Sequence, residues 1–446
     1  MKRRRLASCL VMGCALSGAV FPHAQTTTTV QFDREIVHVL DDHCVMCHAE
    51  KGLAFPLVTY EQTYASRWKI RQDALNRHMA PWAAVSGYGG FSNDNGLTQR
   101  EIDFLVSWAE SFGPRNNGEV NAGIATGPSP GKPVQAHFDI NRWRLGDPDL
   151  RLALPPNTVT PRQADEVKRV TLDPRLTGDR WLRGLEYRPA DGRVVHAVSV
   201  AIQETGEWLG SWTPWHPYFE LPTGLAYRLP AGSHLLVEIH SYGSSEPVTE
   251  RASLGLYFAT QPSRRKVANM ALNASWAAGS PRKLLGSRRL EEDASILALQ
   301  PEIHPGIQSI EVSARKPDGT TQILLFARKI PLEWPTPYVL REPISLPKGT
   351  QLSVIEHYAD DASVPVAGFP VTFSAYSSGA AGESVEELHI ATPLRGRADA
   401  AQVSSLGSRD EVRLQRRQAL DPGHPGAREI GDLARKAVTE IFSDRP

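Results

Sequence analysis

The spacing of apolar residues divides the chain into two kinds of region. Residues 32–43 and 96–113 place apolar side chains three and four positions apart, which predicts two amphipathic helices, the second opening at the candidate N-cap Thr98. The expected buried faces are Ile36, Val39 and Leu40 in the first helix, and Ile102, Leu105, Val106 and Ala109 in the second. Beyond residue 136 the period changes to two, in short runs such as VVHAVSVAI (194–202) between Pro and Gly turns. This pattern predicts a small helical unit followed by a long all-β region.

The β region contains an internal repeat. LPAGSHLLVEIH (229–240) matches LPKGTQLSVIEH (346–357) at an offset of 117 residues, and each copy ends in a histidine, His240 or His357. A duplication predicts two jelly-roll-like β-sandwiches, 136–262 and 263–395. The alternative is a recurrent turn-and-strand pattern without duplication.

The segments outside these units are polar or resemble a targeting signal. The expected order along the chain is a signal peptide (1–24), the helical unit (28–114), a linker rich in Gly, Pro and Asn (115–135), the two sandwiches, and a polar tail with one helix (396–446). Four basic residues precede an apolar run over 6–21, so export to the periplasm or the medium is expected, with a lipoprotein cut before Cys14 as the alternative.

Charge and hydropathy limit the partners. The 49 basic and 49 acidic side chains cancel, so neither nucleic acid nor an acidic membrane surface is expected as a partner. After the predicted signal peptide, no stretch approaches the roughly 18 apolar residues that a membrane-spanning helix needs.

A CxxCH motif provides the clearest chemistry. Of the four cysteines only Cys44 and Cys47 follow the predicted signal peptide, and His48 comes directly after them. A zinc site needs four ligands and a redox pair needs no histidine, whereas haem c attachment uses both thiols and takes the histidine as axial ligand of the iron. We therefore expect a covalently bound haem c between the two helices, and the helical unit (28–114) is predicted to be a small α-helical cytochrome c domain.

The second axial ligand is expected in RHMAPWAAV (77–85). HMAPW resembles the stretch of cytochrome-c-like domains in which the methionine binds the iron, so Met79 is the candidate. His78 is the alternative ligand, in which case Met79 fills the core. Ligation by His and Met raises the reduction potential relative to two histidines.

Several stretches of the β region together resemble one family. They are WRLGDPDLRLALP (143–155), RGLEYRPADGRVVHAVSV (183–200), 229–259, 296–319, 335–352 and GESVEELHIA (382–391). The region is similar to the copper type II, ascorbate-dependent monooxygenases, the family of peptidylglycine α-hydroxylating and dopamine β-monooxygenases, and more closely to bacterial relatives with a cytochrome c domain in front. The resemblance implies two copper ions, one in each sandwich. One copper, with three His ligands, passes electrons; the other, with two His and one Met, binds O2 and hydroxylates a C–H bond.

The copper ligands implied by the resemblance are only partly present. At the first site His196 and His240 are kept, while Ala197 stands where the family has a third histidine. At the second site His304 is kept and Glu302 replaces a histidine.

The methionine of the second site falls at Leu388. Candidate substitute ligands are His357, His389 and, for the first site, His216. The alternative for each of these histidines is that it binds no metal and is an ordinary hydrogen-bonded residue.

The expected function is that of an exported oxidoreductase. The haem domain would pass electrons from a redox partner protein or a small-molecule reductant to copper, and an O2-dependent oxidation of an unknown organic substrate would occur near His304 and Glu302. The alternatives are a non-catalytic electron carrier whose β domains are a scaffold that has lost ligands, and a copper-binding module without turnover. Copper analysis discriminates among them.

Overall fold

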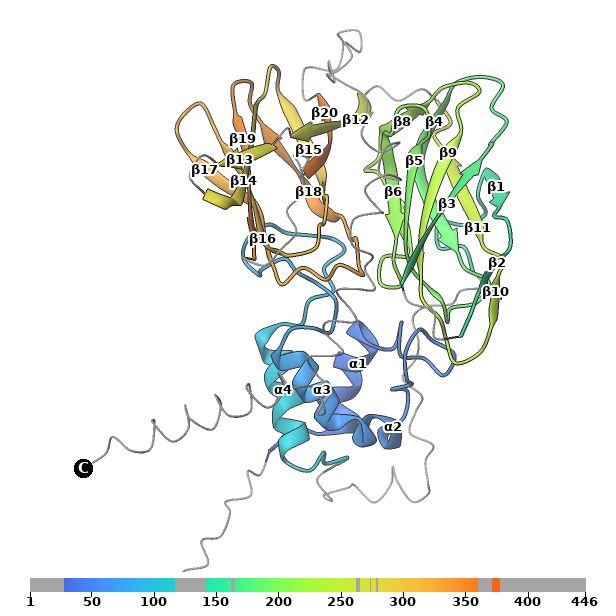
Figure 1. Cartoon of the computed structure of the whole chain (residues 1–446), viewed down its shortest axis with the longest axis vertical. Helices are drawn as coiled ribbons and strands as arrows, with labels where there is room; N and C mark the ends of the chain where they lie inside the picture. The colour runs from blue at the N-terminus through green and yellow to red at the C-terminus, as the bar shows by residue number, and fades with distance from the viewer. Residues whose placement is uncertain are drawn as a thin grey trace, which may run out of the picture.

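The computed structural model describes residues 28–116, 142–161, 165–261, 265–272, 274–277, 280–359 and 371–377. The predicted signal peptide, nearly all of the predicted linker, the predicted boundary between the sandwiches, His389 and the polar tail lie outside these residues. The described chain forms a small helical region followed by mostly β-sheet domains, as the sequence predicts (Figure 1).

The helical unit contains both expected helices. Its elements are η1 (Phe32–Ile36, a π-helical turn), α1 (Val37–His43), α2 (Tyr60–Ala65), α3 (Arg67–Leu75) and α4 (Gln99–Glu110). Thr98 caps α4 and forms a capping box with Glu101, because each side chain accepts a hydrogen bond from the backbone of the other residue. The predicted faces are buried except for Val106, which is half-buried.

Trp108 completes the core of the helical unit. Its side chain is fully buried, and its Nε1–H donates to the carbonyl of Pro114 at 3.0 Å. The backbone N–H of Phe32 donates to the same carbonyl. The chain after α4 therefore folds back over the start of the first helix instead of leaving the unit at once.

Each β-sandwich has one sheet of its own. In the first sandwich this is the four-stranded sheet β3 (Glu166–Leu172), β9 (Leu235–Ser241), β5 (Val195–Ile202) and β6 (Trp208–Trp212). In the second it is the five-stranded sheet β13 (Ala274–Ala277), β14 (Ser280–Arg289), β19 (Gln351–Tyr358), β16 (Ile307–Arg315) and β17 (Thr321–Arg328). A short ribbon pairs β10 (Val248–Glu250) with β2 (Asn157–Val159).

The opposite layer is one continuous sheet shared by both sandwiches. Its order is β1 (Leu150–Ala153), β11 (Ser253–Phe258), β4 (Arg180–Arg188), β8 (Leu225–Leu229), β12 (Arg265–Leu272), β20 (Val371–Ser377), β15 (Ala294–Pro301) and β18 (Tyr338–Leu346), with β7 (Tyr218–Glu220) paired to β4. The parallel pair β8–β12 joins the two halves, with Val267 opposite Tyr227. The sandwiches are therefore joined by backbone hydrogen bonds, which the sequence pattern does not predict.

The repeated sequences form the same turn. Ser233 donates from its N–H and Oγ to the carbonyl of Pro230, and Thr350 makes the same two contacts with Pro347. Gly232 and Gly349 have φ of 73° and 86°, a region that favours glycine. The two copies differ at their last histidine, because His240 is buried and His357 is exposed.

The segment after Met79 anchors the helical unit to the second sandwich. Val85 donates to the carbonyl of Phe326, and Ser92 donates to that of Val339. Trp82 packs against Tyr338 with ring centroids 5.1 Å apart. This segment therefore extends the second sandwich and fixes the helical unit beneath it (Figure 1). Among the described residues, no helix is both long enough and apolar enough to cross a bilayer.

Candidate haem-binding loop and metal centre

The CxxCH motif lies at the C-terminal end of α1. Cys44 is the C-cap residue of that helix, and the N–H groups of Cys47 and His48 both donate to its carbonyl. Both thiols are free, and burial raises the pKa of each to about 12. A side chain at Gly52 would collide with the carbonyl oxygen of Cys47, so the loop that follows packs tightly onto the motif.

One ring nitrogen of His48, Nε2, is available to bind a metal. Its Nδ1 lies 2.7 Å from the carbonyl oxygen of Phe55, and because a carbonyl only accepts, Nδ1 carries the proton. The neutral ring then has an unprotonated Nε2, the form that binds a metal. Burial lowers the pKa of His48, which favours this neutral form. Two free thiols and an oriented imidazole fit covalent haem attachment at this loop.

Met79 and His78 differ in exposure. The side chain of His78 is 65% exposed and its Nδ1 lies 3.7 Å from Asp73 Oδ1. Met79 is half-buried, and its N–H donates to the carbonyl of Asp73 at 3.5 Å. Burial lowers the pKa of His48, and the carboxylate of Asp73 opposes this by raising it. Helix α3, which contains Asp73, therefore brings His78 and Met79 close to the predicted proximal ligand. Met79 remains the predicted second axial ligand.

A β-bulge positions His196. The register of β5 against β9 shifts between Val195 and Ala197, and His240 of β9 pairs with Ala197, so His196 is the extra residue. Val195 and Val198 both belong to the core of the first sandwich. The two residues between them therefore both lie on the outer face of the sheet, and His196 is placed beside His240.

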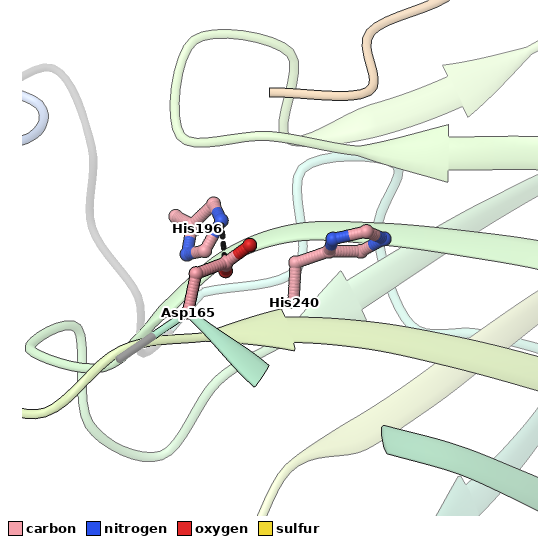
Figure 2. Close-up of side chains that lie close together, drawn as sticks. All are labelled: Asp165, His196 and His240. Carbon is pink, nitrogen blue, oxygen red and sulfur yellow. Dashed lines mark ion pairs between the residues drawn. The ribbon is translucent and has the colours of Figure 1, made fainter. Parts of the chain in front are cut away.

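Asp165 joins the two histidines from the adjacent strand. It immediately precedes β3, in which Val167 pairs with His240, and residues two apart on a strand share a face. One ligand atom from each of Asp165, His196 and His240 lies within 4.8 Å of the others, and Asp165 Oδ1 is 3.3 Å from His196 Nε2 (Figure 2). Within the described residues this is the one group of three or more His, Cys, Asp or Glu side chains suited to a metal.

The neighbours of the histidines leave both Nδ1 atoms unpaired. His196 Nε2 lies 2.8 Å from the carbonyl oxygen of Glu333, and His240 Nε2 lies 3.1 Å from Glu238 Oε1. Both acceptors require a proton on Nε2, so each neutral ring has an unprotonated Nδ1. Both Nδ1 atoms are buried without a hydrogen-bond partner. Buried imidazole nitrogens with an unused lone pair fit a metal site, and Asp165 approaches this pair of rings at Nε2 of His196.

Aromatic rings from two parts of the molecule enclose His196. The Tyr242 ring, just after β9, lies 4.8 Å from the His196 ring at an angle of 33°. Trp334, from the loop between β17 and β18 of the second sandwich, lies 5.0 Å away at 66°. His196 is 0% exposed and His240 is 3% exposed. The candidate metal centre is thus shielded from water and lies between the two sandwiches.

The residues predicted for the second copper site form no comparable group among the described residues. His304 Nε2 lies 3.7 Å from Glu302 Oε1 in the turn between β15 and β16, and both side chains are partly exposed. His357 is exposed on β19, whereas its neighbours Glu356 and Tyr358 are buried, so His357 points to the opposite face. Burial is the main cause that raises the pKa of Glu356, and the charge of Glu302 raises it further.

His216 lies apart from the metal group. It is not among the three clustered side chains, and its ring packs against Tyr218 and Phe219. Burial lowers its pKa to about 4. Asp165, which the sequence analysis did not select, takes the third position instead. The only local signal for Asp165 is an acidic residue at the start of a strand, a pattern too common to indicate a ligand.

Comparisons with known proteins identify no relative. No protein family and no curated protein matches the chain. Among solved structures, the M60 catalytic domain with the CBM51-1 and CBM51-2 domains of Clostridium perfringens ZmpB matches at 9% identity and a TM-score of 0.14, over 48% of this chain and 34% of that chain. The chain thus spans about a third of that structure.

The CBM22-1–CBM22-2 tandem domain of Paenibacillus barcinonensis Xyn10C matches at 11% identity and a TM-score of 0.14, over 52% of this chain and 98% of that chain. Similarity at this level carries no information about activity. The functional argument therefore rests on the site itself.

Proposed function

We propose that this chain is an exported redox protein in which haem c, bound to the helical unit, exchanges electrons with a metal ion held by Asp165, His196 and His240. The observation that carries the proposal is the clustering of Asp165, His196 and His240, in which both buried Nδ1 atoms lack a hydrogen-bond partner. A group of this kind costs free energy unless a ligand satisfies it, and a metal ion does so.

The haem assignment rests on the loop geometry. Cys44 and Cys47 would form the thioether bonds, His48 would supply Nε2, and Met79 would supply the second axial ligand. When bound, the haem supplies reversible one-electron chemistry at its iron. The carbonyl of Phe55 holds the imidazole orientation, and the close approach at Gly52 holds the loop.

Copper is the metal we expect at the second centre. Imidazole ligands suit copper, zinc and iron, and the affinity of such a site for divalent metals is highest for Cu2+. A carboxylate stabilises the charge of Cu2+, and Glu238 and the carbonyl of Glu333 orient the two imidazoles. The resemblance to the copper monooxygenases supports the same choice.

Oxidation of an organic substrate by O2 is the second part of the proposal. It requires a further centre near Glu302 and His304, whose 3.7 Å separation is the one observation in its favour. Stoichiometric O2 consumption with a reductant and a substrate present would support this step. If O2 is not consumed while copper is bound, the chain acts as an electron carrier or a copper-binding module.

Metal analysis tests the proposal directly. Protein purified after export should contain one iron, one covalent haem by haemochrome spectrum, and one copper that wild type retains on gel filtration. Replacing Asp165, His196 and His240 together by alanine should remove the copper and leave the haem. A colourless polypeptide, or copper retained by the triple variant, would refute the proposal; zinc or iron in place of copper would refute only the choice of metal.

A further inference from the structure

Two tryptophan rings extend in a row from the candidate metal centre. The ring of Trp334, from the loop between β17 and β18, lies 5.0 Å from the His196 imidazole, and the ring of Trp215 lies 5.0 Å from that of Trp334 at an angle of 46°. Trp334 is 9% exposed, whereas Trp215 is half-buried and meets the solvent. Trp334 and Trp215, the tryptophan pair, therefore join the buried centre to the surface by two consecutive ring contacts.

The backbone holds both rings of the tryptophan pair in place. Trp215 lies in the tight turn between β6 and β7, where Thr213 and His216 exchange two backbone hydrogen bonds of 3.2 and 3.0 Å. The carbonyl of Trp334 accepts a hydrogen bond from the N–H of Thr336 at 2.8 Å. Because Trp215 belongs to the first sandwich and Trp334 to the second, the pair crosses the interface between the sandwiches.

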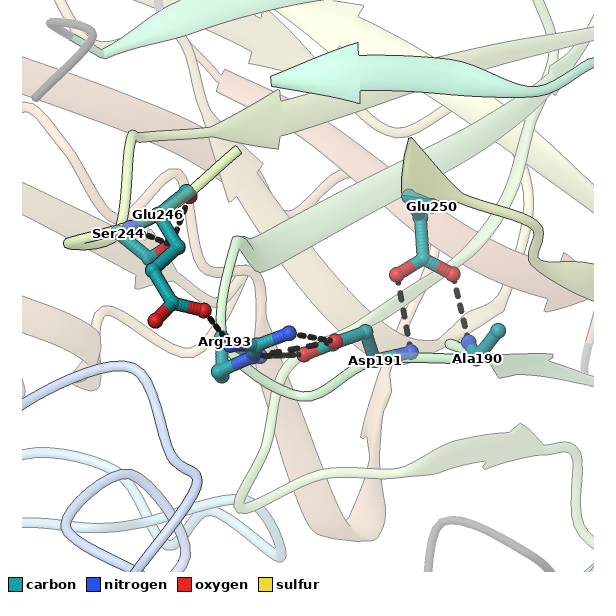
Figure 3. Close-up of polar contacts among 6 residues, drawn as sticks. All are labelled: Ala190, Asp191, Arg193, Ser244, Glu246 and Glu250. Carbon is teal, nitrogen blue, oxygen red and sulfur yellow. Dashed lines mark hydrogen bonds and ion pairs between the residues drawn. The ribbon is translucent and has the colours of Figure 1, made fainter. Parts of the chain in front are cut away.

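The ring contacts on the other side of His196 end at Tyr242. This ring lies 4.8 Å from the imidazole, and among the described residues its one ring contact is with His196. The turn before β5 and the loop after Tyr242 are joined by ion pairs of Arg193 with Asp191 at 2.6 Å and with Glu246 at 3.8 Å (Figure 3). Carboxylate and guanidinium groups give up an electron far less readily than an indole ring, so the tryptophan pair offers the longer path.

We infer that the tryptophan pair carries an oxidising equivalent from the metal centre to the surface. The inference rests on the proposed function and adds a protective activity to it, with hydrogen peroxide as the oxidant. The O–O bond of H2O2 breaks as the molecule accepts one electron from Cu+ and one from Trp334 and takes up two protons from solvent. The products are two water molecules, Cu2+ and a Trp334 ring that has lost one electron.

The oxidised site then moves outward. Trp215 gives one electron to Trp334, so the partly exposed ring becomes the oxidised one, and a soluble reductant such as ascorbate returns Trp215 to its original state. Without a reductant, the oxidised ring loses a proton and forms a covalent bond with a nitroso spin trap, so the adduct marks the end of the path. The transfer spares His196 and His240, the imidazoles nearest to the oxidant.

Trp276 provides a matched control. It is half-buried like Trp215, its ring packs against Tyr358 at 5.6 Å in the second sandwich, and among the described residues no ring contact joins it to the metal group. Trp334→Phe keeps a ring beside His196 but removes the easily oxidised indole. Trp215→Phe removes the outer member of the pair, and Trp276→Phe removes the control indole.

The experiment treats protein that carries haem and copper, after reduction and removal of the reductant, with H2O2 and the spin trap. Mass spectrometry of the digested protein measures the adduct at each tryptophan. Trp215 should carry at least an order of magnitude more adduct than Trp276, and Trp334→Phe should lower the adduct at Trp215 by a similar factor. Trp215→Phe should move the adduct to Trp334, and Trp276→Phe should leave the adduct at Trp215 unchanged. Copper content and the Cu2+ paramagnetic resonance signal should match those of wild type in all three variants.

The haem is a second possible source of oxidation by H2O2. The variant in which Asp165, His196 and His240 are replaced by alanine keeps the haem and lacks the copper, so it should form no adduct at Trp215. An adduct at Trp215 equal to that of wild type in this variant would assign the oxidation to the haem and overturn the inference.

Two further results would overturn the inference: equal adduct at Trp215 in wild type and in Trp334→Phe, or equal adduct at Trp276 and Trp215 in wild type. If Trp334→Phe loses its copper, Trp215→Phe decides, and an adduct at Trp334 no greater than in wild type would overturn the inference. A wild-type protein that lacks copper would instead refute the proposed function, so the two failures are distinguishable.

Discussion

Asp165 Oδ1 lies 3.3 Å from Nε2 of His196, although Asp165 directly precedes β3, His196 lies on β5, and β9 separates these two strands. The contact exists because the bulge in β5 turns His196 to the outer face and because Asp165 occupies that face at the start of β3. Two strands and the residue that leads into a third thus each provide one candidate metal ligand, with His240 of β9 in the middle.

Replacing Asp165 by Asn tests its part in metal binding. The variant keeps the shape of the side chain and removes its charge, so affinity for Cu2+ should fall by about 10–100-fold or more. Titration with Cu2+ against a competing chelator measures the change. The control is Asp179→Asn, since Asp179 is an exposed residue paired with Arg228 away from the site, and it should bind Cu2+ as wild type does. Equal affinity in Asp165→Asn would remove Asp165 from the ligand set.

Replacing Cys47 by Ser tests covalent attachment. The variant loses one thioether, so normal haem attachment should be abolished and the haem stain on a denaturing gel should disappear or fall sharply. Ser107→Ala, at a hydroxyl that contacts Thr28 within the helical unit, is the control and should stain normally. A full-strength stain in Cys47→Ser contradicts the assignment of the motif.

Met79→Ala and His78→Ala distinguish the two candidate axial ligands. Loss of the true ligand opens the sixth position of the iron, so the absorption spectrum should change from low-spin to high-spin. We expect this change in Met79→Ala and not in His78→Ala, whose side chain is largely exposed. The reverse result would assign His78, and each spectrum is recorded with the haem content held equal.

Glu356 should make stability depend on pH. Burial is the main cause that raises its pKa from 4.5 to about 7, and Tyr358 donates to its Oε2 at 2.7 Å. Between these values the folded chain binds more protons than the unfolded chain, so the free energy of unfolding falls as pH rises from 4.5 to 7. The loss is at most about 3 kcal/mol, the equivalent of the pKa shift.

Glu356→Gln should therefore be more stable relative to wild type at pH 8 than at pH 5. Denaturant unfolding followed by Trp fluorescence at both pH values measures the difference. Glu342→Gln, at an exposed strand position, is the control. Its free energy of unfolding should differ from that of wild type by the same amount at pH 5 and at pH 8. If the free energy of unfolding depended on pH identically in wild type and Glu356→Gln, the ionisation of Glu356 would not destabilise the folded chain.

The sequence predicts local structure well and long-range placement poorly. Helical spacing and the Thr98 cap identify α4, and the repeated Pro and Gly residues identify two equivalent turns, because neighbouring residues determine these features. The bulge at His196 adds only one residue to a strand, and no composition signal marks it. Asp165 could not be found for a similar reason, since its partners follow it by 31 and 75 positions.

The contact between the helical unit and the second sandwich also has no local signal. Ala84 and Phe91 form bridges with Ala327 and Leu340, more than 240 residues away, and the alternation of the intervening chain is too short to predict a strand. Residue type alone does not show whether Trp82 and Phe91 pack in a helical core or at the edge of a sheet.

The parallel pair β8–β12 limits how the molecule can be divided or opened. Cutting the chain near residue 262 would expose one unpaired edge on each half, and such edges promote aggregation. Separately expressed halves are therefore expected to precipitate or to recombine. For the same reason a hinge motion that separated the two sandwiches would have to break the pairing of β8 with β12, so this pairing keeps Trp334 of the second sandwich against His196 of the first.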